Sequence, residues 1–279
     1  MQIKSKNKQK IRVIDGSVPS LTQYLLNVWN YRHLILTLTK RDLKVKYAQT
    51  ALGFLWAVIQ PLTGLLIFTI FFDKLIKVDT NGIPYPLFAF SGIVTWYFFT
   101  YTMAAGGVVL SESGEIIKKI YFPRLVLPIT KMLMGFVDFL ISLGLLVILM
   151  LIFQVKITWA ILFLPILIIL NALIGLAVAI WLSALTIQYR DFQHIIPYLL
   201  NFGIWLTPVF YPGTLIPDAY QFLLYINPMA ALLAAFRWAM LGDVVPHVGY
   251  LISLIPVLLM FFTGILYFRK IEDDIADYI

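Results

Sequence analysis

The chain contains no cysteine and has few charged side chains. Of its 279 residues, 13% are charged and 61% are hydrophobic, whereas soluble domains average about 25% charged residues. The lack of cysteine excludes a disulfide framework, a thiolate metal site and a thiol nucleophile. So apolar a chain leaves little material for a soluble domain, and we expect an integral membrane protein.

Several motifs of nucleotide and hydrolytic chemistry are also missing. The sequence has no G-x-x-x-x-G-K-[ST] phosphate-binding loop, no H-E-x-x-H zinc motif and no G-x-S-x-G nucleophile turn. His33, His194 and His247 lie far apart, without the spacing of metal ligands. We therefore expect no catalytic residues and no metal site. Any work driven by ATP has to be powered by another polypeptide.

Six apolar stretches are candidates for transmembrane helices. A helix needs about 20 residues to cross the hydrocarbon core, and only the fifth stretch is slightly short of this. The predicted spans are 52–72, 86–110, 125–153, 159–187, 195–211 and 248–268. The sequence therefore predicts an all-α integral membrane protein with one membrane domain over residues 21–279.

The distribution of lysine and arginine predicts the orientation. With six spans, 17 of the 21 basic residues fall on the side of the two termini, against 4 on the other side. Basic residues accumulate in cytoplasmic loops, so both termini are predicted to be cytoplasmic. The net charge of +7 is then a consequence of topology, and we do not expect nucleic-acid binding.

Two regions outside the spans have a pattern of their own. After a basic tail at residues 1–20, apolar residues recur at helical spacing from Leu21 to about Lys40, which indicates an amphipathic helix along the inner interface. At 216–241, two apolar pieces too short to span are separated by Asn227 and Pro228. We interpret them as a re-entrant hairpin between spans five and six. A surface loop with two interfacial helices is the alternative.

Asp138 is the only ionisable residue deep inside a predicted span, with Lys131 two turns earlier. Proton-coupled carriers usually need several intramembrane carboxylates or histidines. We therefore favour a structural role for Asp138, in a polar contact between helices, over a role in transport.

Five segments in order resemble motifs of ABC-2 type permeases that export polysaccharides. They are the run Lys40–Leu62, the segment Lys119–Arg124 with Tyr-Phe-Pro-Arg, the triplet Tyr189–Asp191, the patch Thr207–Pro212, and Asn227–Met229 with Phe236–Trp238. The similarity covers nearly the whole chain from about residue 21. Its details are closer to the O-antigen lineage than to the teichoic acid lineage.

The resemblance implies a homodimeric permease in the bacterial plasma (inner) membrane. Two copies of a separate cytoplasmic ATP-binding-cassette subunit would use ATP and Mg²⁺, and the cargo would be an undecaprenyl-linked polysaccharide such as O-antigen, capsular polysaccharide or teichoic acid. Three alternatives stay open: an ABC-2 exporter of drugs or lipids, a membrane-embedded glycosyl-lipid enzyme, and a passive channel.

Charged residues on the cytoplasmic side are candidates for two roles. The connection between spans two and three has acids near its start and bases near its end, which suits a short helix, and in the family this loop docks on the ATPase. The coupling candidates are Glu112, Glu115, Lys118 and Lys119.

The candidates for binding a lipid pyrophosphate head group are Arg41, Lys44, Lys46, Arg124 and Arg190. The positive-inside rule alone would also place these cations here, and Asp42 is expected to pair with a neighbouring base.

Aromatic and hairpin residues complete the predicted site. Sugars present apolar C–H faces and hydroxyls that suit aromatic rings with a polar tip, and Trp56, Tyr198 and Trp205 are the first candidates to line a channel. Asn227, Pro228 and Arg237 belong to the hairpin, which would close the outer end, and Asp218 is a possible partner for Arg237. Glycines 53, 64 and 203 place spans one and five at the predicted dimer seam.

Overall fold

The computed structural model describes residues 20–48, 50–272 and 275. These residues form helices and connecting loops, with no strand among them. The α-helices are α1 (Leu21–Asn30), α2 (Arg32–Ala48), α3 (Trp56–Phe68), α4 (Tyr85–Glu112), α5 (Gly114–Lys119), α6 (Val126–Ile152), α7 (Leu164–Gln188), α8 (Phe192–Leu206), α9 (Phe222–Ile226), α10 (Pro228–Leu241) and α11 (Leu254–Glu272). Short 3-10 turns are η1 (Gly53–Leu55), η3 (Trp159–Phe163), η4 (Gly213–Leu215), η5 (Asp218–Tyr220) and η6 (Val248–Ser253), and η2 (Thr69–Leu75) is a π-helical continuation of α3.

Five helical segments are long and apolar enough to cross a membrane, or up to six if the bent pair α9–α10 with its preceding turn counts as one. They are Gly53–Leu75, Tyr85–Glu112, Val126–Ile152, Trp159–Gln188 and Val248–Glu272. These agree with predicted spans one to four and six. The predicted fifth span contains only α8, whose 15 residues rise about 22 Å.

The early end of α8 has a local cause. Thr207 precedes Pro208, and a residue before proline is disfavoured in the α conformation. Its backbone is accordingly extended, with φ −111° and ψ 133°. The segment from Thr207 to Phe210 is nonetheless buried, so its carbonyl groups need protein donors.

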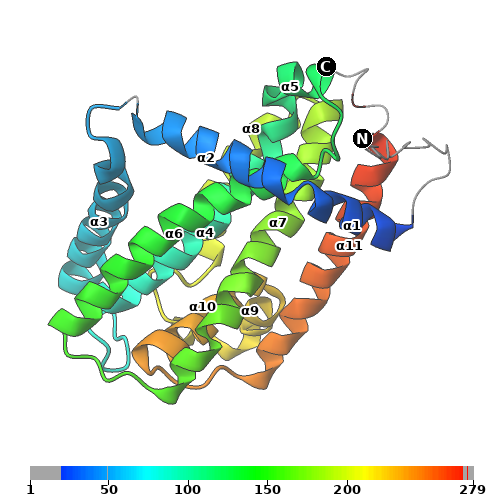
Figure 1. Cartoon of the computed structure of the whole chain (residues 1–279). Coiled ribbons are helices and arrows are strands. Elements are labelled where there is room, and N and C mark those ends of the chain that lie inside the picture. Colours follow the sequence, from blue (N-terminus) through cyan, green and yellow to red (C-terminus); the bar gives the residue numbers. More distant parts are fainter. Residues whose placement is uncertain (1–19, 49, 273–274, 276–279) are drawn as a thin grey trace, which may run out of the picture.

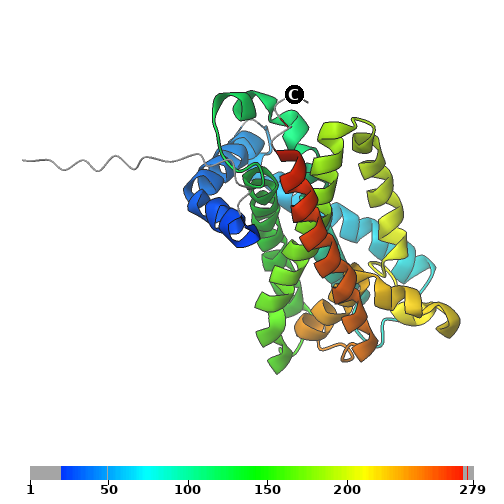
Figure 2. The same cartoon turned by 90° about the vertical axis from the view of Figure 1, so that its right-hand side faces the viewer.

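The helices run alternately between two ends of the molecule. Figures 1 and 2 show α2, α5 and the C-terminal end of α11 at one end, and α9 and α10 at the opposite end. A hydrogen bond of 2.6 Å from the Arg124 backbone N–H to Glu272 joins the loop after α5 to the end of α11. The described N-terminal helices and the end of α11 therefore lie on the same side as α5.

The N-terminal segment predicted as an amphipathic helix consists of two helices. Ser20 caps α1 through a reciprocal pair of hydrogen bonds with Gln23, and the chain then passes through Tyr31 into α2, which lies across α6 (Figure 1). Tyr24 and Ile35 are buried against the bundle, whereas Trp29 is 65% exposed. Its location at the membrane interface stays a prediction, and the basic tail lies almost entirely outside the described residues.

Helix α4 forms the centre of the bundle, and α3 lies at its edge. In the most apolar 18 residues of each segment, 61% of the residues of α4 are buried, but only 6% of those of Gly53–Leu75, which contains α3. Close packing of α4 depends on small residues, since a Cβ at Gly106 would lie 2.8 Å from the Cβ of Ala179 in α7. The outer face of α3 has no partner of comparable extent within the described chain.

The region between α8 and α11 is a bent helical pair. The helical segments Asp218–Ile226 and Pro228–Leu241 meet at an angle of 93°. The side-chain oxygen of Asn227 accepts hydrogen bonds from the N–H groups of Met229 and Ala230 and so caps α10. Helix α10 ends at Gly242, which has a φ of +71° that favours glycine.

Candidate functional site

A cavity of about 590 Å³ lies between the end of α2 and helices α3, α4 and α6. Its walls combine aromatic rings with hydrogen-bonding groups. They include Lys46, Tyr47, Trp56, Gln60, Tyr97, Phe98, Thr100, Tyr101, Asp138, Phe139 and Ser142. Rings with polar tips offer both the apolar surface and the hydrogen bonds that a sugar requires.

A second cavity of about 600 Å³ lies beside the first, nearer to α5. Lys46 and Tyr101 line both, so the two cavities adjoin at these side chains, between the α4–α5 corner and the interior of the bundle. The second cavity has charges of both signs: Arg41, Lys46 and Lys131 face Asp42, Glu112 and Glu115. We call the two cavities together the α2–α6 groove.

Asp138, in the wall of the first cavity, connects α2 to α6 beside Lys46, which lines both cavities. Its carboxylate accepts hydrogen bonds from the Lys46 ammonium group and the Tyr47 hydroxyl. The Lys46 Nζ also lies 4.7 Å from the ring centroid of Tyr101. The predicted polar contact of Asp138 between helices is confirmed, with Lys46 as its cation partner. That its role is structural stays a prediction.

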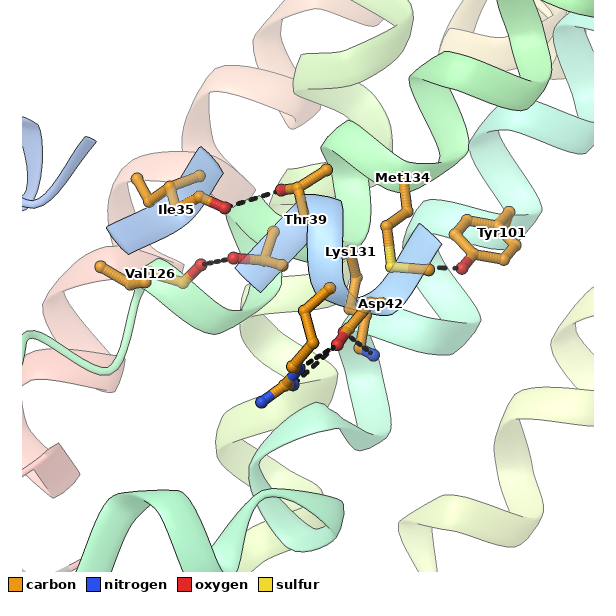
Figure 3. Close-up of polar contacts among 9 residues, drawn as sticks. Ile35, Thr39, Asp42, Tyr101, Val126, Lys131 and Met134 are labelled. Carbon is orange, nitrogen blue, oxygen red and sulfur yellow. Dashed lines mark hydrogen bonds and ion pairs between the residues drawn. The ribbon is translucent and has the colours of Figure 1, made fainter. Parts of the chain in front are cut away.

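Lys131 pairs instead with Asp42, as Figure 3 shows. The Lys131 Nζ lies 2.9 Å from one Asp42 oxygen, and Arg41 donates two hydrogen bonds of 2.7 and 2.8 Å to the other. Burial alone would raise the pKa of Asp42, but the hydrogen bonds from Lys131 and Arg41 outweigh it and lower that pKa below its usual value. The expected pairing of Asp42 with a neighbouring base is confirmed.

The five predicted head-group cations are not gathered in one cluster. Arg41 and Lys46 line the α2–α6 groove, where each is already paired with a carboxylate. Lys44 and Arg190 are exposed. The Arg124 guanidinium donates to the carbonyl of Phe122 and lies over the ring of Tyr121. Lys131 joins Arg41 and Lys46 instead, a proximity that only the fold reveals.

The predicted coupling segment is the short helix α5 at the end of the bundle (Figure 2). Glu115 lies in its first turn and Lys118 and Lys119 in its last, as the charge order indicated. The Lys119 ammonium group lies 2.9 Å from Glu115, and both side chains are largely exposed. Ile117 is buried and anchors α5 to the bundle, while Glu112 is the last residue of α4.

Only one of the three aromatic candidates lines the groove. Trp56 is part of its wall and is 50% exposed. Tyr198 and Trp205 lie on the outer face of α8, with 63% and 56% of their surface exposed. Sequence reasoning missed Gln60 and Phe139 as wall residues. Phe139 is one of many apolar residues in α6, whereas Gln60 was a visible signal, since only it and Thr63 are polar in the apolar α3.

The expected contact of Arg237 with Asp218 is wrong. The Arg237 guanidinium donates hydrogen bonds to the carbonyls of Pro208 and Val209, at 2.9 and 2.6 Å. Asp218 accepts from Gln221 instead. Arg237 lies in the middle of α10 and is 4% exposed, so it satisfies the carbonyls of the non-helical segment after α8 rather than a surface carboxylate.

The glycines of the predicted dimer seam serve contacts within the chain. A Cβ at Gly64 would lie 3.2 Å from the Tyr97 hydroxyl, and one at Gly203 would lie 3.1 Å from the Trp96 ring. Both therefore let α3 and α8 approach α4. Gly53 has a φ of +46° at the start of η1, where glycine relieves backbone strain.

Comparisons with known proteins agree with this architecture. The model of the ABC-2 type transporter family matches residues 33–241, and the chain belongs to this family. It is 30% identical over 213 residues to the O-antigen export system permease protein RfbA of Myxococcus xanthus, covering 75% of this chain and 81% of the relative. It is 24% identical over 248 residues to the RfbA permease of Klebsiella pneumoniae, covering 88% and 94%. The polysialic acid transport protein KpsM of Escherichia coli is 24% identical over 249 residues, covering 84% and 91%.

Proposed function

We propose that this chain is the membrane permease subunit of an ATP-driven exporter that moves lipid-linked polysaccharide, with O-antigen as the favoured cargo, out of the cytoplasm. The observation that carries the proposal is that relatives named as polysaccharide export permeases match along most of the chain. The aromatic and hydrogen-bonding walls of the α2–α6 groove support a saccharide cargo. An exporter of drugs or lipids and a membrane-embedded glycosyl-lipid enzyme are both less favoured, because neither accounts for these relatives.

In this proposal the groove receives the head group at its charged part. Arg41, Lys46 and Lys131 each have a carboxylate partner in this structure. A pyrophosphate would compete with Asp42 and Asp138 for these cations, because a phosphate oxygen is also a strong acceptor for guanidinium and ammonium groups. The exposed Lys44 and Arg190, and Arg124 in the loop after α5, would attract the anion from farther away.

The energy for transport would come from a cytoplasmic ABC ATPase, two copies of which would use ATP and Mg²⁺. Helix α5 is the proposed contact, since it lies exposed at the end of the bundle with Glu115, Lys118 and Lys119 on its surface. Both termini would be cytoplasmic, in the bacterial plasma (inner) membrane, because the basic residues concentrate on that side.

We further propose that two copies of the chain form the conduit. Two surfaces are available for a second copy: the exposed side of α3 and the exposed aromatic face of α8. A twofold axis would make the contact isologous. In such an arrangement α8 and the following segment together would cross the membrane as the fifth of six spans. The bent pair α9–α10 would be a re-entrant hairpin that closes the outer end, with Asn227 and Pro228 at its bend.

Reconstitution tests this function directly. Proteoliposomes that contain the permease and its partner ATPase should transport lipid-linked polysaccharide when ATP is present. Liposomes with the permease alone, or with an ATPase variant that cannot hydrolyse ATP, are the controls. Passage of saccharide through the permease alone would show a passive channel, and export of a drug or simple lipid in preference to the polymer would favour the other class of exporter.

A further inference from the structure

Arg237 joins three parts of the chain that are distant in sequence. Its Nη1 donates to the Pro208 carbonyl at 2.9 Å, and its Nη2 donates to the carbonyls of Val209 and Phe88 at 2.6 and 3.4 Å. Its guanidinium carbon also lies 3.5 Å from the ring centroid of Phe88. We call this set of contacts the hairpin junction, because α10, the non-helical segment after α8 and the first turn of α4 meet there.

The composition of the junction is unusual for a site that only has to be stable. Arg237 is 4% exposed, and its contacts are carbonyl groups rather than a carboxylate. Its Nε has no hydrogen-bond partner within the described chain. An arginine buried without a directly bonded counter-ion is costly, and an apolar residue of similar volume would avoid that cost. The planar fork of donors, which reaches two segments at once, is what an apolar residue would lack.

Helix α4 extends from this junction to the proposed ATPase contact. It has 28 residues, so it is about 42 Å long, and only Ser113 separates it from α5. No proline interrupts it after Pro86 in its first turn, whereas α3 and α8 contain the interior prolines Pro61 and Pro197. Rigid secondary elements, such as a buried helix without an interior proline, are among the structures that carry coupling between distant sites.

Gly92 gives a second, independent view of how closely α4 approaches the junction. A Cβ at this position would lie 2.5 Å from the Val209 carbonyl oxygen and 3.0 Å from the Arg237 Nη2. Only a glycine lets α4 pass this close. The contact is therefore specified from both sides, by the guanidinium on α10 and by the missing side chain on α4.

We propose that Arg237 is a positioning residue that couples the outer hairpin to α4, so that a displacement of α5 moves α10 and the segment after α8 together. This inference rests on the proposed function, in which α5 contacts the ATPase and the hairpin closes the outer end. It adds the path between them and names the residue at which the path reaches the hairpin.

The experiment uses the complete complex of permease and partner ATPase in proteoliposomes. For each variant we would measure assembly, ATP hydrolysis and the amount of polysaccharide exported per ATP. Arg237→Gln should still assemble and hydrolyse ATP, but export per ATP should fall by roughly tenfold or more, because charge-assisted hydrogen bonds to two segments are lost. Arg237→Lys keeps the charge and should recover part of this ratio. Lys156→Gln, which removes an exposed charge, is the matched control.

Gly92→Ala tests the junction without removing the charge. It should lower export per ATP in the same way, because the methyl group would displace Val209 and Arg237. Gly144→Ala is its control, since a Cβ there meets no atom within 4 Å. Wild-type export per ATP in both Arg237→Gln and Gly92→Ala would overturn the inference, as would a failure of both to assemble, which would make the junction a folding element only. Lack of export by the wild-type complex would instead refute the proposed function.

Discussion

The ion pair between Lys46 and Asp138 ties α2 to α6, and its removal should have a measurable cost. The two side chains are 35% and 25% exposed, so the pair is neither at the open surface nor fully buried. Exposed pairs contribute about 0–1 kcal/mol, and breaking a buried pair costs about 3–5 kcal/mol. We therefore expect Asp138→Asn to lower the free energy of unfolding by about 1–3 kcal/mol. The amide can still accept from Tyr47, so this cost arises mainly from the unpaired ammonium group of Lys46.

A double-mutant cycle on the purified permease in detergent measures the interaction itself. Lys46→Met and Asp138→Leu, alone and together, remove each charge without adding a new polar group. The coupling energy should be about 1–2 kcal/mol, and the double variant should be more stable than either single variant. Lys44→Met, on the same helix but exposed, is the control. A coupling energy below about 0.5 kcal/mol, the usual error of additivity, would refute the reasoning.

The same variants separate a structural role of Asp138 from a role in transport. If the carboxylate only holds α2 against α6, assembled Asp138→Asn should export polysaccharide at a rate within about threefold of wild type, since no interaction with the moving cargo is lost. A well-folded variant whose export falls by more than about a hundredfold would show that the carboxylate acts on the cargo.

Three further predictions concern other parts of the site. Reversing the charge of Lys118 or Lys119 should weaken co-purification with the ATPase, and unchanged binding would argue against α5 as the contact. Trp56→Ala should slow export while the protein still assembles, because Trp56 lines the groove. Trp205→Ala should slow export only if a second copy brings α8 to the conduit. Unaltered export by either variant would remove that residue from the wall. The pKa of Asp42 is lowered in the folded chain. The ionised Asp42 side chain therefore contributes to stability above the pKa of the unfolded chain, about 3.8. This contribution is lost as the pH falls through the lower pKa of the folded chain. The difference in thermal stability between wild type and Asp42→Asn should thus be constant from about pH 5 to 8 and shrink only in stronger acid, and a difference that disappears near pH 6 would contradict this.

Most of the fold follows from local features of the sequence. Apolar length alone identifies the segments that become α4, α6, α7 and α11, because a helix that crosses the hydrocarbon must satisfy its own backbone groups. The interruption at Asn227 predicts the bend, since an asparagine before a proline is a strong helix start. The predicted fifth span, 195–211, is helical only up to Leu206, and its last five residues lie outside α8. Pro208 ends the helix there, although the residues around it are as apolar as those inside a span.

The candidate site was harder to predict because its contacts join distant segments. Lys46 and Asp138 are 92 residues apart, and nothing in the local pattern distinguishes Lys46 from Lys44 as the partner. Arg237 was assigned to Asp218 because opposite charges were the only available guide. The carbonyl groups that it actually contacts are invisible in a sequence, since every residue has one. Residue types thus indicated which chemistry was present, and the fold decided which groups meet.

The exposed face of α3 shows a further limit that is specific to membrane proteins. In water, an unburied apolar helix would point to a missing partner, but lipid covers such a face at little cost, so apolarity cannot separate a lipid-facing surface from an interface. Small residues are the better sign of helix contact, yet Gly64 and Gly203 are already used against α4. The remaining sign of an interface on α3 is that the walls of the α2–α6 groove are unequally supported. Among the residues that the structure describes, almost nothing backs the wall of the cavity that α3 forms. The opposite walls belong to α4, the most buried of the spans, and to α6. A polymer conduit needs all of its walls to be supported, and a second copy packed on α3 would supply that support without any change in the contacts described for a single chain.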